Sequence, residues 1–251
     1  MSFPFDVQLP EGAERTTGTT KMFRLGQKGV TIDGRIFRYF KADAALDYPL
    51  YCIGGAEVQS LDAGAVYLAH AAGVYQVTID GTSDGDPAED YYNDSLIFFY
   101  EDEYPTMRII KSEAALAASP YGVLLTLDGP TPHALSDNCV VYIQPNMYAG
   151  AVCCFQGGGD SNLSIRPALG VPAVKVASGS YGWAQTGGPC VCVPAGTTIG
   201  SAAWDRVCAW STDGSVIPLD EAINADHSPQ IAGYSMAVNG SGTLWVNLTM
   251  D

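Results

Sequence analysis

Seven cysteines are the residues of this sequence best suited to metal binding or redox chemistry. Their positions are Cys52, Cys139, Cys153, Cys154, Cys190, Cys192 and Cys208. Structural zinc sites usually pair two knuckles in which about two to four residues separate the cysteines, a spacing absent here. On a strand, Cys190 and Cys192 point to one face, which serves core packing equally well. The odd count and the apolar neighbours therefore predict buried free thiols, with no metal site and no cofactor.

Groups used in hydrolysis are present, but they form no recognisable motif. Ser161 follows a run of glycines, yet the Gly-x-Ser-x-Gly elbow is absent. The three histidines are His70, His133 and His227, and the last two lie in turn-like sequences. A Ser–His–Asp triad built from distant residues stays open. A glycosidase-type carboxylate pair also stays open, because 27 acidic residues always supply two. We predict no catalytic residues and no enzymatic activity.

Acidic residues gather between Asp80 and Asp94, where carboxylate oxygens could bind Ca²⁺. The spacing of an EF-hand loop is absent, because Pro87 directly follows Asp86 and the closing glutamate is missing. A solvated loop is therefore the favoured interpretation, and Ca²⁺ binding is the alternative.

Aromatic residues are numerous enough to build a sugar-binding platform. The four tryptophans are Trp183, Trp204, Trp210 and Trp245, and fourteen tyrosines accompany them. Large aromatic side chains in β proteins more often fill the core. We therefore favour core positions and keep an exposed platform as the alternative.

Charge is distributed unevenly in a chain whose net charge is −15. Residues 1–41 carry seven of the twelve Lys and Arg residues but only four of the 27 acidic residues. The acidic remainder would repel nucleic acid, so we predict no nucleic-acid partner. Four cations near the N-terminus are candidates for docking on an acidic protein surface: Arg15, Lys21, Arg24 and Lys28. The alternative is that this basic segment only balances the acidic body of its own protein.

Composition and periodicity predict a mostly β fold, of the β-sandwich or barrel-like type, with an extended N-terminal arm. The sequence has 28 Gly and 15 Pro residues, which suit many short strands. No apolar run approaches the roughly 20 residues that span a membrane, so no membrane contact is expected. No signal peptide is evident, so synthesis in a cytosol is expected.

Strands are predicted where apolar or β-branched residues alternate between turn sequences. The predicted strands are Gly73–Ile79, Leu96–Tyr100, Met107–Lys111, Tyr121–Leu127, Cys139–Gln144, Ala151–Gln156, Ala173–Ala177, Tyr181–Thr186, Cys190–Val193, Val207–Trp210, Ser215–Leu219, Tyr234–Val238 and Thr243–Thr249. In the last strand, Leu244, Val246 and Leu248 are expected on one face and Trp245 on the other. Glu113–Ala118 is a weak helix candidate.

An early hairpin is predicted at Asp33-Gly34, because Asp-Gly suits a type I′ turn with both central residues at positive φ. Residues 1–28 show no lasting period and are predicted to be the extended arm. Residues 29–156 are predicted to be one β domain, 157–172 a Gly-rich linker, and 173–251 a C-terminal β domain. The two β parts are expected either as one body or as two small subdomains.

Three segments of the sequence match blocks that occur together in one group of proteins. Gly29–Ala42 is similar to a G-R-x-F-R-Y-x-K-A block, and Tyr104–Ser112 to a Y-R-I-K-S strand. Ala177–Cys190 is similar to a Y-G-W-V-Q-T-x-G-P-C block, although Ala184 and Gly187 stand where larger residues are more usual. In this last block, Trp183 is expected to pack and Gly187-Gly188-Pro189 to turn the chain. With these blocks the chain resembles a group of tailed-bacteriophage virion proteins that are encoded near the major capsid gene.

The resemblance implies a structural virion protein, a decoration or cement protein on the outer surface of a phage head. Its implied partners are the major capsid protein and, by analogy with decoration proteins, two further copies in a homotrimer. The implied location is the capsid surface, after synthesis in the host cytoplasm. Decoration predicts capsid binding that depends on residues 1–28. The first alternative is a tail, neck or fibre module that binds host glycan, and the second is a virion-associated hydrolase.

Overall fold

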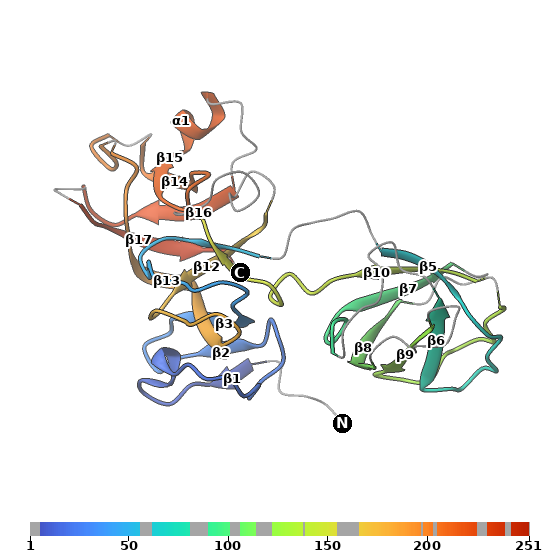
Figure 1. The fold of residues 1–251 in the computed structure, drawn as a ribbon. Coiled ribbons are helices and arrows are strands. Elements are labelled where there is room, and N and C mark those ends of the chain that lie inside the picture. Colours follow the sequence, from blue (N-terminus) through green and yellow to red (C-terminus); the bar gives the residue numbers. More distant parts are fainter. Residues whose placement is uncertain are drawn as a thin grey trace. The chain divides into compact units, whose positions relative to one another are not determined.

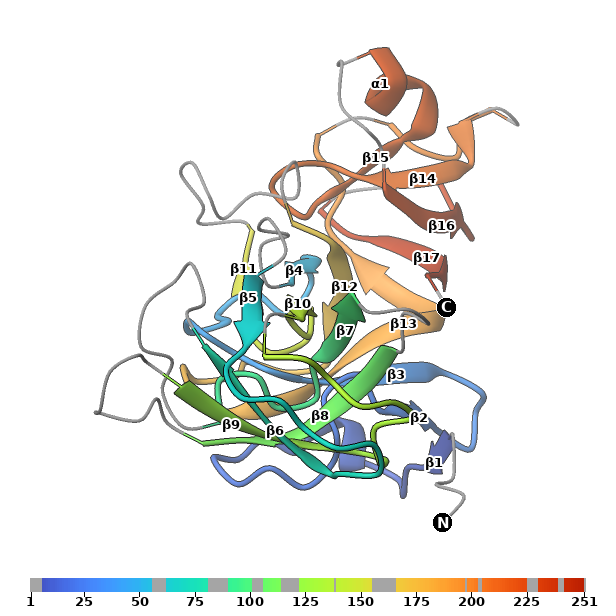
Figure 2. The same ribbon diagram turned by 90° about the vertical axis from the view of Figure 1, so that its right-hand side faces the viewer.

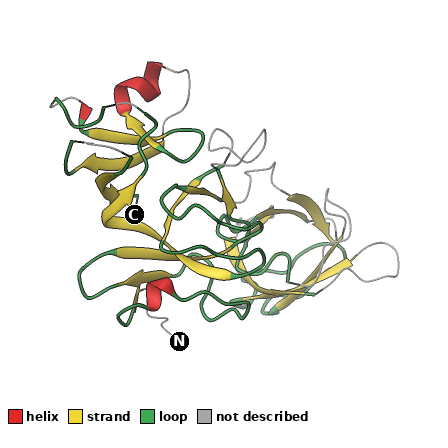
Figure 3. Cartoon of the chain, turned by 60° about the vertical axis from the view of Figure 1, so that its left-hand side comes forward, coloured by secondary structure: helices red, strands yellow, loops and turns green. Residues whose placement is uncertain are grey.

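The computed structural model confirms the predicted mostly β fold, with 48% strand and 4% helix. It describes residues 6–55, 62–80, 90–100, 106–113, 122–137, 139–154, 166–196, 198–202, 205–224, 230–238 and 242–250. Within these ranges the helical elements are the 3₁₀ turn η1 (Ala13–Arg15) and helix α1 (Leu219–Asn224), drawn in red in Figure 3. The helix candidate Glu113–Ala118 lies almost entirely outside the described residues.

The chain forms two compact units, and one is inserted into the other. Met1–Val58 and Met147–Asp251 form the first, here called the sheet unit. Gln59–Asn146 forms the second, the barrel unit. This division differs from the predicted one, because the chain returns to the sheet unit about ten residues before the predicted break at 157–172. Of that predicted linker, residues 157–165 lie outside the described residues, and residues 168–172 form a strand.

The sheet unit contains one mixed sheet of eleven strands, in the order β1-β2-β3-β13-β17-β16-β14-β15, while β12, β4 and β11 pair beside this path (Figure 1). Its strands are β1 (Asp6–Gln8), β2 (Lys28–Val30), β3 (Ile36–Lys41), β4 (Ile53–Gly54), β11 (Val152–Cys153), β12 (Ala168–Pro172), β13 (Tyr181–Cys192), β14 (Val207–Trp210), β15 (Val216–Pro218), β16 (Gln230–Ser235) and β17 (Leu244–Thr249). Buried side chains of these strands, among them Phe37, Trp210 and Val246, form the core of the unit.

The barrel unit is a closed antiparallel barrel of six strands, in the order β10-β5-β6-β9-β8-β7 (Figure 2). Its strands are β5 (Asp62–Val66), β6 (Gln76–Asp80), β7 (Leu96–Tyr100), β8 (Thr106–Ser112), β9 (Gly122–Leu127) and β10 (Val140–Gln144). Side chains that alternate inward, among them Val77, Ile97 and Leu125, fill its core. Closure leaves no unpaired strand edge, so each of these short strands has a partner on both sides.

The N-terminal segment is not the extended arm that its irregular sequence predicts. β1 pairs in parallel with β2, and the Leu9 N–H donates to the Val30 carbonyl at 2.8 Å. Leu9 is buried in a cluster with Trp183, and Phe23 packs its ring 5.2 Å from the same indole. Residues 6–28 therefore belong to the sheet unit, held by spaced apolar contacts that have no regular period.

The predicted β2–β3 hairpin is present, but its turn is not type I′. Only Gly34 has a positive φ, 82°, while Asp33 does not. The Thr31 and Gly34 N–H groups close the turn by donating to the carbonyls of Arg35 and Thr31. The Asp33 carboxylate accepts hydrogen bonds from the Thr31 hydroxyl and the Arg35 side chain, which stabilise a longer turn that needs one left-handed residue.

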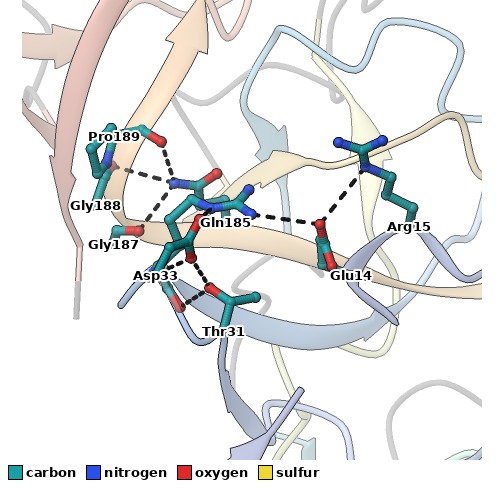
Figure 4. A network of polar contacts seen from close by, with 9 residues as sticks. Glu14, Arg15, Thr31, Asp33, Gln185, Gly187, Gly188 and Pro189 are labelled. Carbon is teal, nitrogen blue, oxygen red and sulfur yellow. Dashed lines mark hydrogen bonds and ion pairs between the residues drawn. The ribbon is translucent and has the colours of Figure 1, made fainter. Parts of the chain in front are cut away.

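The predicted turn at Gly187-Gly188-Pro189 is wrong, because the chain runs on as the single strand β13. This strand pairs with β3 along its first half and with β17 along its second. A register shift follows Gln185, whose side-chain amide donates to the carbonyls of Gly187, Gly188 and Pro189 (Figure 4). The side chain thus satisfies carbonyls at an irregularity that would otherwise interrupt the strand.

β13 also joins two predicted strands, Tyr181–Thr186 and Cys190–Val193, into one. The strand predicted at Ala173–Ala177 lies earlier, as β12. No helix in the described part of the chain is long and apolar enough to cross a membrane.

Candidate functional site

The thiols lie in the core of the protein. All seven cysteines are free and buried, and Cys52, Cys154, Cys190, Cys192 and Cys208 share one core cluster of the sheet unit. Burial raises the pKa of Cys154 to about 12 and that of Cys208 to about 11, so these groups are protonated thiols at neutral pH. Within the described residues, no group of three or more His, Cys, Asp or Glu side chains is arranged to hold a metal ion.

Among the described candidates for acid–base chemistry, His70 has a structural role. The Nε2 atom of His70 accepts a hydrogen bond from the Thr78 N–H at 3.1 Å, and burial lowers the pKa of this imidazole. His70 is therefore a neutral acceptor that ties a loop to β6. Ser161, His227, Trp204 and residues 81–89 of the predicted acidic stretch Asp80–Asp94 lie outside the described residues.

The four predicted docking cations all lie in the packed N-terminal segment of the sheet unit. Arg15 and Lys21 are exposed, whereas Arg24 and Lys28 are partly buried. Arg15 contributes an ion pair with Glu14, whose Oε1 atom lies 3.7 Å from the Arg15 Nε atom. The exposed charges of this segment are thus presented by a folded surface and not by a free arm.

Glu14 anchors that surface to the β2–β3 turn (Figure 4). Its side chain is only 5% exposed, and its Oε1 atom lies 3.6 Å from an Arg35 guanidinium nitrogen. Arg35 in turn donates from Nε to Asp33 at 2.8 Å. The network links η1 to the β2–β3 turn through a buried carboxylate and leaves Arg15 at the surface.

An aromatic face of the sheet unit is the clearest exposed feature outside that segment. Tyr234 and Trp245 are 50% and 53% exposed, and Met236 is 51% exposed. Tyr234 lies opposite Asn247 in the β16–β17 register, and the Met236 N–H donates to the Trp245 carbonyl. These four residues therefore form a block of two neighbouring cross-strand pairs on the outward face, here called the aromatic block.

Three uncharged residues adjoin the aromatic block on the two neighbouring strands. Val207 of β14 lies opposite Tyr234. Pro189 and Val191 of β13 lie opposite Asn247 and Trp245. The intervening residues of β17 point inward, as the alternation in its sequence predicts: Leu244, Val246 and Leu248 are buried.

The tryptophans divide between core and surface. Trp183 and Trp210 are buried, in agreement with the favoured interpretation of core positions. Trp245 is exposed, so the platform alternative applies to it alone among the three described tryptophans. The alternation of β17 already placed Trp245 on the face opposite Leu244, Val246 and Leu248, whereas its neighbours on β14 and β16 follow only from strand pairing.

The barrel unit has an apolar stripe on its outer face that sequence reasoning missed. Val140 lies opposite Tyr100, and Tyr142 opposite Phe98, in the β7–β10 register. Tyr100, Val140 and Leu96 are exposed, and the rings of Phe98 and Tyr142 lie 6.5 Å apart. The signal was in the sequence, because Leu96–Tyr100 is apolar without alternation, a pattern typical of a strand with both faces covered.

The chain matches no protein-family model, no curated protein and no solved structure. A functional assignment therefore has to come from the residues and the surfaces described above.

Proposed function

We propose that this chain is a structural virion protein that decorates the head of a tailed bacteriophage by binding the major capsid protein. The observation that carries the proposal is the resemblance of three segments to virion proteins. Two of these segments lie side by side, because Gly29–Ala42 supplies β2 and β3, and Ala177–Cys190 supplies most of β13. The remaining segment, Tyr104–Ser112, supplies β8. The similar residues thus form strands of the two units, and a shared structural role would preserve such strands.

Two surfaces support the proposal because each suits contact with another protein. The basic segment of the sheet unit presents Arg15 and Lys21 from a folded surface, and this favours an acidic partner. The apolar stripe of the barrel unit presents Tyr100 and Val140, which gain stability when a partner covers them. A protein of net charge −15 that carries a local basic surface would bind a capsid in one orientation.

The test is co-sedimentation of the purified chain with capsids of the phage that encodes it. Deleting residues 1–28 is unsuitable, because it would remove β1 and expose the Trp183 cluster. The sharper variant is Arg15→Glu combined with Lys21→Glu, which reverses two exposed charges. Lys175→Glu is the matched control, since Lys175 is exposed on the same unit and lies outside the basic segment.

We expect the wild-type chain to bind, and the double variant to bind about tenfold more weakly at low salt, with the difference shrinking as salt rises. The control should bind like the wild type. A folded wild-type chain that leaves capsids unbound would overturn the proposal. Equal binding by the double variant would overturn the role of the basic segment.

A further inference from the structure

We infer that the aromatic block of the sheet unit is a binding site for neutral carbohydrate. The site consists of Tyr234, Met236, Trp245 and Asn247 on the outward face of β16 and β17. This inference does not rest on capsid attachment, because it concerns a different surface and a ligand that the isolated chain would bind.

The geometry supplies two ring faces on one diagonal of the sheet. Tyr234 pairs with Asn247, and Trp245 pairs with Met236, so the two rings belong to neighbouring cross-strand pairs. Diagonal neighbours on one face of an antiparallel pair lie roughly 7–8 Å apart, within reach of large aromatic side chains. The two rings therefore occupy adjoining positions on one face of the sheet, within reach of one extended ligand.

The chemistry of these side chains matches that of a sugar ring. The C–H groups on one face of a pyranose carry partial positive charge, and they pack against the negative face of an aromatic ring. Asn247 lies between the rings with both a donor and an acceptor, which suit sugar hydroxyl groups. Among the described residues, the Asn247 amide has no hydrogen-bond partner of its own. Its polar atoms are therefore available to a ligand.

The charge of the protein disfavours an anionic ligand. The four residues of the aromatic block and its neighbours Val207, Pro189 and Val191 are uncharged. An anionic polysaccharide would meet a protein of net charge −15. A neutral glycan meets no such repulsion.

A platform of this kind is sufficient for a few sugar units, whose binding depends on a small number of stacked rings and orienting polar groups.

The test is titration of the purified full-length chain with cello-, malto-, chito- and manno-oligosaccharides, with oligogalacturonate as the anionic comparison. Binding is followed by calorimetry and by intrinsic tryptophan fluorescence. The variants are Trp245→Ala, Tyr234→Ala and Trp245→Phe. Tyr75→Ala is the matched control, because Tyr75 is 55% exposed on the barrel unit. Circular dichroism and thermal melting establish that each variant is folded.

We expect the wild type to bind at least one neutral oligosaccharide and not the anionic one. Trp245→Ala should weaken binding about tenfold or more, the loss typical of a central aromatic contact, and Tyr234→Ala should also weaken it. Trp245→Phe should keep part of the affinity, because it retains an aromatic ring. This variant also keeps the test valid if the alanine variant misfolds. Tyr75→Ala should bind normally.

The inference is overturned if the folded wild type binds none of the neutral oligosaccharides, or binds only oligogalacturonate. It is also overturned if Trp245→Ala and Tyr234→Ala bind as the wild type does, or if Tyr75→Ala loses as much. Capsid co-sedimentation has no part in these readouts, so failure of the decoration proposal would be seen separately.

Discussion

Asp33 shows how one side chain makes the β2–β3 turn sensitive to acid. The hydrogen bond from the Thr31 hydroxyl, at 2.5 Å, and that from the Arg35 side chain, at 2.8 Å, hold the pKa of this carboxyl below its usual value of 3.8. A lowered pKa in the folded state stabilises the fold fully above the unfolded-state pKa. This contribution disappears as the pH falls through the folded-state value.

Asp33→Asn should therefore lower the melting temperature by a few degrees at most near neutral pH, since the carboxylate is 53% exposed and screened by solvent. The difference from the wild type should close as the pH falls through the lowered folded-state pKa of Asp33, because both side chains are then neutral. Thermal melts across this pH range provide the measurement. Asp47→Asn, at a similarly exposed aspartate, is the control. A gap that persists in acid would contradict the assignment.

The buried cysteines predict a slow thiol reaction in the native protein. Burial raises the pKa of Cys154 to about 12 and the pKa of Cys208 to about 11, and it also raises the pKa of Cys52. Only a thiolate attacks a disulfide reagent, and a reagent must also reach it. Ellman's reagent at pH 8 should therefore label all seven thiols in urea, but label the native protein about a hundredfold more slowly or worse. Immediate labelling of the native protein would show an accessible thiolate.

At the scale of elements, the sequence predicts strands wherever local pattern determines them. The alternation of Leu244 to Thr249 gives the correct strand and the correct faces, because one side of β17 lies on the core. It fails at Gly187-Gly188-Pro189, where a turn composition is kept in a strand by the Gln185 amide and by two partner strands. The local sequence pattern does not indicate such long-range contacts.

The same limit explains the remaining differences. Helix α1 has acidic residues in its first turn, but six residues are too few to show a helical period. The closure of the barrel depends on the pairing of β10 with β5, across most of the inserted segment. Trp245 could be placed outward from sequence, whereas its position beside Tyr234 and Val191 required the strand order.

The N-terminal strand gives a direct test of packing at this scale. Leu9 fills the space above Gly29, where an added Cβ atom would lie 2.7 Å from the Leu9 Cδ1 atom and 2.9 Å from Trp183. Leu9→Ala should therefore lower the free energy of unfolding by about 2–5 kcal/mol. Met22→Ala, at a side chain that is 72% exposed, should change it by less than about 0.5 kcal/mol. Urea unfolding measures both variants. If Leu9→Ala leaves the free energy of unfolding unchanged, residues 6–9 form a loose arm after all.

At the scale of the whole molecule, the barrel unit is an insertion with its own closed core. Gly55, the last described residue of the sheet unit before the insertion, adjoins Met147, where the chain returns to that unit. An added Cβ atom on Gly55 would lie 2.6 Å from the Met147 carbonyl oxygen. The sheet unit therefore does not need the barrel unit to hold its two chain segments at the correct separation.

Two separable folds should follow from this insertion. Replacing residues 59–146 by a Gly/Ser linker of about four to six residues should leave a folded sheet unit, because a loop of that length joins adjacent chain ends. Residues 59–146 alone should fold as well, since all six strands are paired within the barrel. Circular dichroism and urea unfolding of each part, compared with the intact chain, provide the measurement. If each part unfolds in urea as it does in the intact chain, capsid binding and sugar binding can each be tested on the separate units. An unfolded sheet unit would instead show that the insertion stabilises the fold into which it is inserted.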